Sequence, residues 1–475
     1  MERVETLVLS LLIASCVSAQ SIVIKDVTVI DATGAPARPG LSAAIEDGRI
    51  SAIAKKIKTP HDATVIEGRG KFLIPGLWDM HIHLGPPEIF FPLLVANGIT
   101  GVREMFTGIP LPLIRQWSAR PDVPKIVAPG FLDGPPMLWN GPPAPGAIAV
   151  ETAEQGRYAV DALARSGFDF LKIYSSVPRE AYFAIAAEAR AIGIPFAGHV
   201  PEAVSPLEAS EAGQRSEEHL MGILAACSTR EEEVRAKRVA TMLDRNLSGE
   251  ARMRELAFPD AETLDESYDE QKAKTLFETF VKNGTWLTPT LAYLEGFARA
   301  RQDDFVRDPR RKYLLKTWNE AWDPRKTFFL KDLSADDYDR LEARVRALLE
   351  RYKKLVGEMH RAGVRFLAGT DANGWNPVYP GFGLHDEMRL LVESGLSPME
   401  ALQAATRNPA MYFGELNARG TVEQGKIADL VLLDANPLDD IANTRKIAAV
   451  IMRGRYFSRE ALDKMLASVA ERAAR

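Results

Sequence analysis

Apolar and polar residues follow two different patterns along the chain. Near both ends, at 21–76 and 420–457, short segments alternate apolar and polar positions and are separated by turn residues, which predicts strands. The long middle instead alternates short apolar runs with Ala-rich amphipathic stretches such as 151–166 and 179–192. These stretches predict helices, and the runs between them predict strands.

The middle contains eight predicted strands, which is the number that a (β/α)8 barrel requires. They are 77–84, 99–105, 125–130, 168–175, 194–200, 215–220, 285–291 and 364–372. We therefore predict an α/β chain with a (β/α)8 barrel over 73–417. The two β-rich ends, 20–72 and 418–460, predict one small β-sandwich domain built from both termini.

Two long charged segments interrupt the predicted barrel. One lies between the strands at 215 and 285, and the other spans 292–360; both mix acidic and basic residues and predict helices. A solvated outer layer is one interpretation of the 228–360 region, and a cap over the barrel mouth is the other.

The first 19 residues have the pattern of an export signal. An apolar run from Leu7 to Val17 is too short to span a membrane and ends in small residues before Gln20. The stretch around Cys16 also resembles a bacterial lipoprotein signal. We expect an exported protein, either periplasmic or secreted, or anchored through a lipid at Cys16.

The bulk composition excludes some partners. The net charge of −5 on 475 residues gives no basic footprint for nucleic acid. Cys16 and Cys227 are the two cysteines, so removal of the signal before Gln20 would leave no intrachain disulfide. We expect a small-molecule substrate, no integral membrane span, and possibly a homo-oligomer.

Lys172 stands out in "FLKIYSS" (170–176), a run that otherwise predicts a buried strand. Side chains alternate along a strand, so Phe170, Lys172 and Tyr174 share one face. A lysine in a protein core is unfavourable unless its charge is neutralised or paired. We therefore expect a neighbouring group that neutralises or pairs the charge of Lys172.

Four of the seven histidines lie at the ends of predicted strands. His81 and His83 project from one face of the first strand, His199 ends the fifth and His219 ends the sixth. Asp371 ends the eighth strand, and Lys172 lies near the end of the fourth. Side chains at the carboxyl ends of barrel strands converge on one active site. Each residue alone has a structural interpretation, but their coincidence at one end favours a site.

This arrangement resembles the binuclear metal-dependent amidohydrolase superfamily over about residues 21–460, in its imidazolonepropionase-like and prolidase-like group. The resemblance is carried by "DMHIHL", the lysine of "FLKIY", "GHVP", "EEHL" and "AGTDA". It implies that Lys172 becomes a carbamate that bridges two metal ions. It further implies that His81, His83 and Asp371 hold one ion, and that His199 and His219 hold the other.

The resemblance also implies the chemistry. Nitrogen and oxygen ligands without cysteine suit Zn²⁺, and Mn²⁺, Co²⁺ or Ni²⁺ are alternatives. A hydroxide that bridges two metal ions is available near neutral pH, because the cations lower the pKa of water. Asp371 would carry a proton from this water to the leaving amine.

Further residues are candidates for supporting roles. Tyr174 is predicted either to contact substrate or to pack. His385, at the start of a helix, is a candidate substrate contact or a structural residue. Asp79 would support the metal ligands, and Arg103 would bind a substrate carboxylate or be structural. The loop 131–147 carries no histidine.

We therefore expect a hydrolase that cleaves an amide or peptide C–N bond in a small substrate, of the N-acyl amino acid or Xaa-Pro dipeptide type. A lactonase or phosphotriesterase acting on the same binuclear site is the alternative within this chemistry. A non-catalytic barrel relative is the alternative outside it, and such relatives usually lack part of the ligand set.

Overall fold

The computed structural model describes residues 21–475 except 107, 136–144, 245, 260, 324–325 and 327–332, and leaves the side chains of 250 and 253 undescribed. The predicted export signal, with Cys16 and Gln20, lies outside the described residues, as does most of the 131–147 loop. Among the helices that the structure does describe, none combines the length and the apolar character that a membrane crossing requires.

All eight strands predicted for the middle of the chain are confirmed with altered bounds, and the structure has two more, because 125–130 is divided between two strands and 147–149 adds another. They form two parallel sheets, ordered β6-β7-β8 and β10-β9-β11-β12-β13-β14-β15. The strands are β6 (Leu77–Ile82), β7 (Ile99–Glu104), β8 (Lys125–Val127), β9 (Pro129–Asp133), β10 (Ala147–Ala149), β11 (Phe170–Ile173), β12 (Phe196–Gly198), β13 (Ser216–Glu218), β14 (Trp286–Thr288) and β15 (Arg365–Phe366).

Two features bring the ends of the parallel sheets together. Ala128 alone separates β8 from β9 in the chain. On the other side, the Met80 amide of β6 donates to the Ala368 carbonyl (2.8 Å), and the Thr370 amide donates to the His81 carbonyl (3.0 Å). The segment that follows β15 therefore runs beside β6, and this places His81 next to Asp371.

Helices alternate with these strands, as an α/β fold requires. The helices that follow individual strands are α1 (Pro87–Ala96), α2 (Leu111–Ser118), α3 (Ala153–Arg165), α4 (Arg179–Ile192), α5 (Pro206–Ala212), α15 (Gly383–Glu393), α16 (Pro398–Ala404) and α17 (Arg407–Tyr412). Capping boxes begin α3 at Thr152 and α5 at Ser205, which fixes where these helices start.

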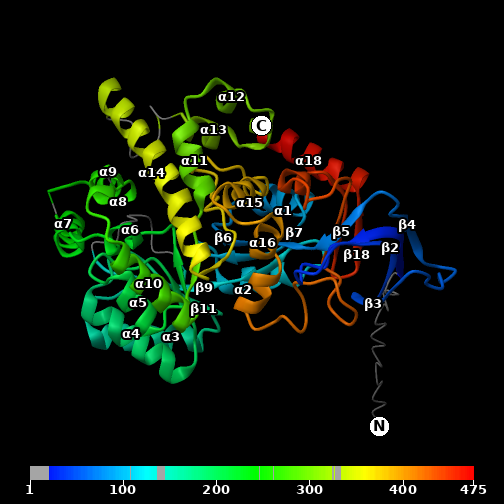
Figure 1. The fold of residues 1–475 in the computed structure, drawn as a ribbon, viewed down its shortest axis with the longest axis horizontal. Helices are drawn as coiled ribbons and strands as arrows, with labels where there is room; N and C mark the ends of the chain where they lie inside the picture. The colour runs from blue at the N-terminus through cyan, green and yellow to red at the C-terminus, as the bar shows by residue number, and fades with distance from the viewer. Residues whose placement is uncertain are drawn as a thin grey trace, which may run out of the picture.

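The two charged segments are helical, as predicted. The first holds α6 (Ile223–Ala226), α7 (Glu231–Leu243), α8 (Gly249–Ala257), α9 (Ala261–Glu266) and α10 (Glu270–Asn283). The second holds α11 (Leu291–Arg299), α12 (Asp303–Val306), η1 (Pro309–Tyr313), α13 (Lys316–Ala321) and the long α14 (Ala335–Arg361). In Figure 1, α7, α8 and α9 lie together at the left, beside α14.

The two ends of the chain share one eight-stranded sheet, ordered β18-β17-β16-β5-β1-β2-β3 with β4 also paired to β1. Its blue and red strands lie at the right in Figure 1. The strands are β1 (Ile22–Val29), β2 (Arg38–Glu46), β3 (Arg49–Ala54), β4 (Thr64–Glu67), β5 (Phe72–Pro75), β16 (Leu430–Leu433), β17 (Ile447–Met452) and β18 (Arg455–Ser458). The short helix η2 (Ile441–Arg445) lies between β16 and β17, and the C-terminal α18 (Arg459–Ala473) follows β18.

Candidate active site

Lys172 lies on β11 and is 1% exposed, and its Nζ has no hydrogen-bond partner among the described residues. The adjacent Gly198 has φ +129°, and a Cβ there would lie 2.3 Å from the Ile173 carbonyl oxygen and 2.8 Å from Lys172 Cδ. A larger residue before His199 would therefore displace the lysine. The strand pairing of β11 with β12 brings Lys172 and His199 together at this point.

The structure brings the predicted metal ligands into one cluster around this lysine. The ring centres of His81 and His219 lie 4.4 Å apart, and those of His199 and His219 lie 4.9 Å apart. His83 Nε2 lies 2.8 Å from Asp371 Oδ1. One ligand atom from each of His81, His219 and Asp371 lies within 4.8 Å of the others, a spacing that suits a shared metal ion.

Burial sets the charge states in this cluster. Burial lowers the pKa of His81 and His199 well below the usual value, and the nearby charge of Lys172 lowers both further. Burial also lowers the pKa of His219 to about 4. These imidazoles are therefore neutral at pH 7, the form that binds metal. Burial also lowers the pKa of Lys172 to about 8, although the negative charges of Glu218 and Asp371 act to raise it.

His83 and Asp371 behave as a charged pair. Burial alone would lower the pKa of His83, but its contacts with Asp371 and Glu104 raise it to about 9. Burial alone would raise the pKa of Asp371, but its hydrogen bond with His83 and the nearby His219 and Lys172 hold it below its usual value. Asp371 is thus a carboxylate that also accepts a hydrogen bond from Asn376 Nδ2 (3.2 Å).

A buried ionic network orients His81. Its Nδ1 donates to Glu218 Oε2 (2.8 Å), so its Nε2, which has no partner among the described residues, keeps a lone pair toward the cluster. Glu218 in turn accepts two hydrogen bonds from Arg103 Nη2 (2.8 and 2.9 Å). Arg103 also donates to Ser216, Tyr412, Thr288 and the Met80 carbonyl.

Hydroxyl groups orient the other two buried imidazoles. Thr290 Oγ1 donates to the Pro289 carbonyl and therefore accepts from His219 Nδ1 (2.8 Å). Ser175 Oγ lies 2.7 Å from His199 Nδ1. For His219 the bond to Thr290 leaves Nε2 available, which is the tautomer control typical of metal-binding histidines.

Backbone strain concentrates at the same place. Three site residues, His219, Thr290 and Asp371, have φ values of +62°, +51° and +56°. Such left-handed conformations are unfavourable for residues with a Cβ, above all for a β-branched threonine, and cluster at functional sites. The strand ends therefore turn sharply where their side chains enter the cluster.

Asp79 supports the site from below, as predicted. Its carboxylate accepts hydrogen bonds from the His81 amide (3.2 Å), the Thr370 amide (3.1 Å) and the Thr370 hydroxyl (2.6 Å). These bonds hold β6 against the segment that ends in Asp371. Asp79 thus fixes the backbone on both sides of the cluster and does not contact an imidazole nitrogen in these bonds.

Two tyrosines line the cluster. The ring of Tyr174 stacks on His199 with centres 4.2 Å apart, and Lys172 Nζ lies 5.9 Å from the Tyr174 ring centre. Tyr293, from α11, lies with its ring centre 6.3 Å from that of His219. Burial raises the pKa of both phenols, so both are neutral hydrogen-bond donors.

The first charged segment covers this site, so the cap interpretation describes it better than a purely solvated layer. Met242 of α7 and Leu256 of α8 form a small apolar cluster against which Tyr174 packs. Phe258, just after α8, stacks on Tyr293 with ring centres 6.4 Å apart. We call residues 231–258 the helical cover.

For His385 and Arg103 the sequence left either a substrate contact or a structural role open, and their contacts favour the structural role. His385 is fully buried on α15, where its Nδ1 shares a 2.9 Å hydrogen bond with Thr444 of η2, and the charges that act on it come from Arg445, Asp386 and Arg310. Its structural interpretation is therefore the better one. Arg103 is likewise committed to Glu218 inside the strands and is not available to a substrate.

Several site residues were not predicted from the sequence. Glu218 and Ser216 lie on the inward face of β13, and "SEEHL" holds two acids in a buried strand. That anomaly is of the same kind as Lys172 and is the signal that points to an internal cation such as Arg103. Tyr293 had no comparable signal, because its role depends on the turn from β14 into α11. Thr290 was predicted to lie at the barrel mouth, but its contact with His219 was not.

The cluster fits a metal-binding site. Two atoms that face it, His81 Nε2 and Lys172 Nζ, are buried without a hydrogen-bond partner among the described residues. Neutral imidazoles with a carboxylate form a nitrogen and oxygen donor set that suits Zn²⁺ and related divalent ions. A carbamate on Lys172 would replace a buried cation by an anionic ligand.

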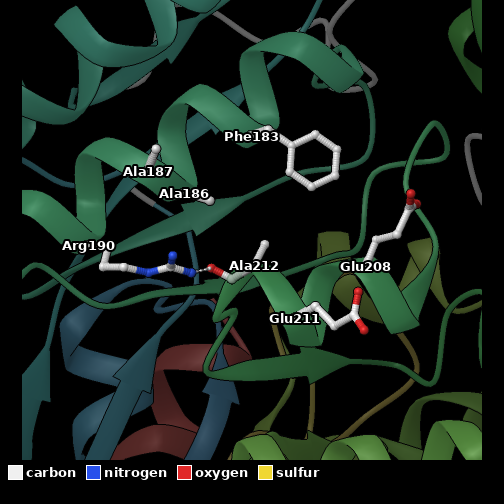
Figure 2. Close-up of a pocket in the computed structure, with 7 residues that line it drawn as sticks. All are labelled: Phe183, Ala186, Ala187, Arg190, Glu208, Glu211 and Ala212. Carbon is white, nitrogen blue, oxygen red and sulfur yellow. Dashed lines mark hydrogen bonds between the residues drawn. The ribbon is translucent and has the colours of Figure 1, made fainter.

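A surface cavity of about 360 Å³ lies away from this chemistry, between α4 and α5. Figure 2 shows its lining, in which Arg190 donates to the Ala212 carbonyl (2.7 Å) and Glu208 and Glu211 lie on the facing helix. None of the cluster residues lines it. A smaller cavity of about 30 Å³ lies between the segments that follow His199 and His219 and borders Arg238 of the helical cover.

The family model described as "Amidohydrolase family" matches residues 174–456. The chain therefore belongs to the amidohydrolase family, whose members are hydrolases.

Individual relatives match over shorter or more distant stretches. Ochratoxinase of Aspergillus niger is 34% identical over 101 residues, which are 21% of this chain and 20% of that protein. Adenine deaminase of Ligilactobacillus salivarius is 36% identical over 92 residues, which are 19% and 15% of the two chains. The chain thus matches a fifth or less of the length of these curated relatives.

Solved structures share the fold over nearly the whole chain. Bottromycin amidohydrolase has a TM-score of 0.68 at 23% identity, covering 95% of this chain and 90% of that one. A putative prolidase from Bifidobacterium longum has a TM-score of 0.62 at 24% identity, covering 95% and 99%. At this level of identity the likeness establishes the fold alone.

Proposed function

We propose that this chain is a metal-dependent amidohydrolase that cleaves the amide or peptide C–N bond of a small substrate, of the N-acyl amino acid or Xaa-Pro dipeptide type. The observation that carries the proposal is the convergence of His81, His199, His219 and Asp371 around a buried, unpartnered Lys172. The parallel strands would close into a (β/α)8 barrel over 73–417. The ends at 20–72 and 418–460 would form a β-sandwich.

The metal assignment follows the donor atoms. His81, His83 and Asp371 would hold one ion, and His199 and His219 would hold the other. Carbamylated Lys172 would bind both ions. When bound, two divalent ions supply Lewis-acid polarisation of the scissile carbonyl and lower the pKa of the attacking water. The Glu218–Arg103 network keeps His81 Nε2 available, and Thr290 does the same for His219.

Asp371 is the residue that moves the proton. It is ionised, and its carboxylate lies at the edge of the cluster, where Asn376 holds one oxygen by a hydrogen bond. Attack by water forms a C–O bond while Asp371 accepts the water proton. Asp371 then gives this proton to the departing nitrogen as the C–N bond breaks, which leaves a carboxylic acid and an amine.

The substrate class rests on the surroundings of the cluster. Tyr174 and Tyr293 offer aromatic faces and neutral phenol donors, and the helical cover closes over them. A compact, partly apolar substrate suits such a site better than an extended polymer. Among the proteins with the same fold are a Xaa-Pro dipeptidase and a prolidase complexed with N-methylphosphonate-L-proline, which supports the dipeptide assignment.

A panel of substrates tests this proposal. Xaa-Pro dipeptides, N-acyl amino acids, lactones and phosphotriesters are compared by kcat/KM at equal enzyme and zinc concentrations, in the presence of bicarbonate. We expect amides to be the best substrates, because the proton on Asp371 assists departure of the nitrogen. Lactones or phosphotriesters that exceed every amide by more than about tenfold, or about 1.4 kcal/mol of transition-state stabilisation, would refute the amide assignment and leave the metal assignment intact.

A further inference from the structure

Arg252, in the helical cover, has no counter-charge among the described residues. It lies on α8 and is 5% exposed, its Nε has no hydrogen-bond partner, and no described residue forms an ion pair with it. Arg238 on the neighbouring α7 shows the usual alternative, because it donates two hydrogen bonds of 2.6 and 2.7 Å to Glu202. The contrast between the two arginines indicates that Arg252 serves a different purpose.

The spacing of α8 relates Arg252 to the residues that cover the cluster. Residues four apart share one face of a helix, so Arg252 lies one turn before Leu256 on the same face. Leu256 packs with Met242 against Tyr174, whose ring stacks on His199. Phe258 continues the contact to Tyr293, which lies beside His219. Leu256 of α8 and Phe258 just after it therefore contact the tyrosines that lie beside His199 and His219, and Arg252 is one helical turn from Leu256.

An unpaired guanidinium is unfavourable in such a place. Burial of a cation without a partner is costly even after relaxation, and the free energy is recovered only when an anion completes the hydrogen bonds. The planar fork of arginine matches a carboxylate, which it binds through two parallel N–H donors. Arg103, the other buried arginine near the cluster, already uses its donors on Glu218.

We infer that Arg252 binds the free carboxylate of the substrate and so selects N-acyl amino acids and dipeptides over their neutral amides and esters. The inference rests on the proposed hydrolase function, which it narrows to substrates with a carboxylate beside the scissile amide. Arg252 is thus a specificity-determining residue contributed by the helical cover, whereas the chemistry is carried out by residues at the strand ends.

The kinetic test varies the charge on both partners. The best amide substrate of the panel and its carboxamide analogue, in which the carboxylate is neutral, are compared with wild type, Arg252→Gln and Arg252→Lys. For Arg252→Gln we expect kcat/KM on the carboxylate substrate to fall about 10- to 100-fold, mostly through KM, the range for a hydrogen bond to a charged group. The carboxamide should change less than about threefold, and Arg252→Lys should lose less than Arg252→Gln.

Arg254→Gln is the matched control, because it removes an arginine from the more exposed side of the same helix. We expect it to keep the preference of the wild type for the carboxylate. If Arg252→Gln weakens both substrates equally, or Arg254→Gln has the same effect as Arg252→Gln, the inference is wrong.

Binding and stability separate this inference from the proposed function. Calorimetry with N-acetyl-L-proline and N-acetyl-L-prolinamide should show carboxylate-selective binding by the zinc-loaded wild type and its loss in Arg252→Gln. If the wild type binds the carboxylate probe selectively but cleaves no amide, the proposed function is wrong and the carboxylate site still stands. Equal binding of both probes, or of neither, would overturn the site. The Tm of Arg252→Gln should not fall, since an unpaired buried charge is removed; a lower Tm would indicate a structural arginine.

Discussion

Lys172→Ala is expected to lose nearly all hydrolytic activity. The substitution removes the side chain that we propose to bridge two metal ions. Lewis-acid stabilisation amounts to several kcal/mol, and at about 4 kcal/mol the loss in kcat is about 10³-fold. Formate or acetate should restore part of the activity, because a small carboxylate can occupy the space of the carbamate. The measurement is kcat on the best amide substrate with and without added carboxylate.

Two variants control this result. Lys125 lies at a half-buried ion pair with Glu415, so Lys125→Ala should retain activity and show no response to carboxylates. Lys172→Met fills the same space without a charge and should have a Tm no lower than the wild type in the absence of metal and bicarbonate, yet remain inactive. An active Lys172→Met enzyme would show that the lysine has no role in catalysis.

Asp371→Asn is expected to lower kcat by about 10²- to 10⁴-fold, the usual contribution of a positioned general acid or base. The amide of asparagine cannot accept a proton from water at neutral pH. It keeps one oxygen donor in the cluster, however, so metal binding should fall much less than activity. The paired measurements are kcat and zinc affinity on the same preparation.

Asn376→Ala is a useful comparison, because Asn376 donates to Asp371 without belonging to the ligand cluster. It should lower kcat by far less than Asp371→Asn. Near-wild-type turnover of Asp371→Asn would refute the proton-transfer role, whereas equal loss of metal and activity would assign Asp371 to metal binding alone.

The ligand cluster was predictable because it depends on strand alternation and on the shared end of parallel strands. His81, His83 and Lys172 could be placed from their strand positions alone, and His199, His219 and Asp371 from the ends of their strands. The network behind them was less accessible. Arg103 and Glu218 lie 115 residues apart in the chain, and only the packing of β7 against the rest of the strands shows that they pair.

Helix starts and insertions were the least predictable features. His385 was a plausible substrate contact at the start of a helix, but the fold turns its ring toward Thr444 of η2. Arg252 carried no signal in a charged, amphipathic segment, because one arginine among many looks solvated. The proposed role of Arg252 depends on which face of α8 packs onto Tyr174. That face is set by the packing of Leu256, on α8, with Met242 of α7.

The central claim is a binuclear metal site bridged through Lys172. Elemental analysis of the wild-type protein, prepared with zinc and bicarbonate and freed of loosely bound ions, tests it directly. We predict two zinc ions per chain in the wild type and about one in Lys172→Ala. A wild-type stoichiometry that stays at one ion per chain in excess zinc and bicarbonate would contradict the account.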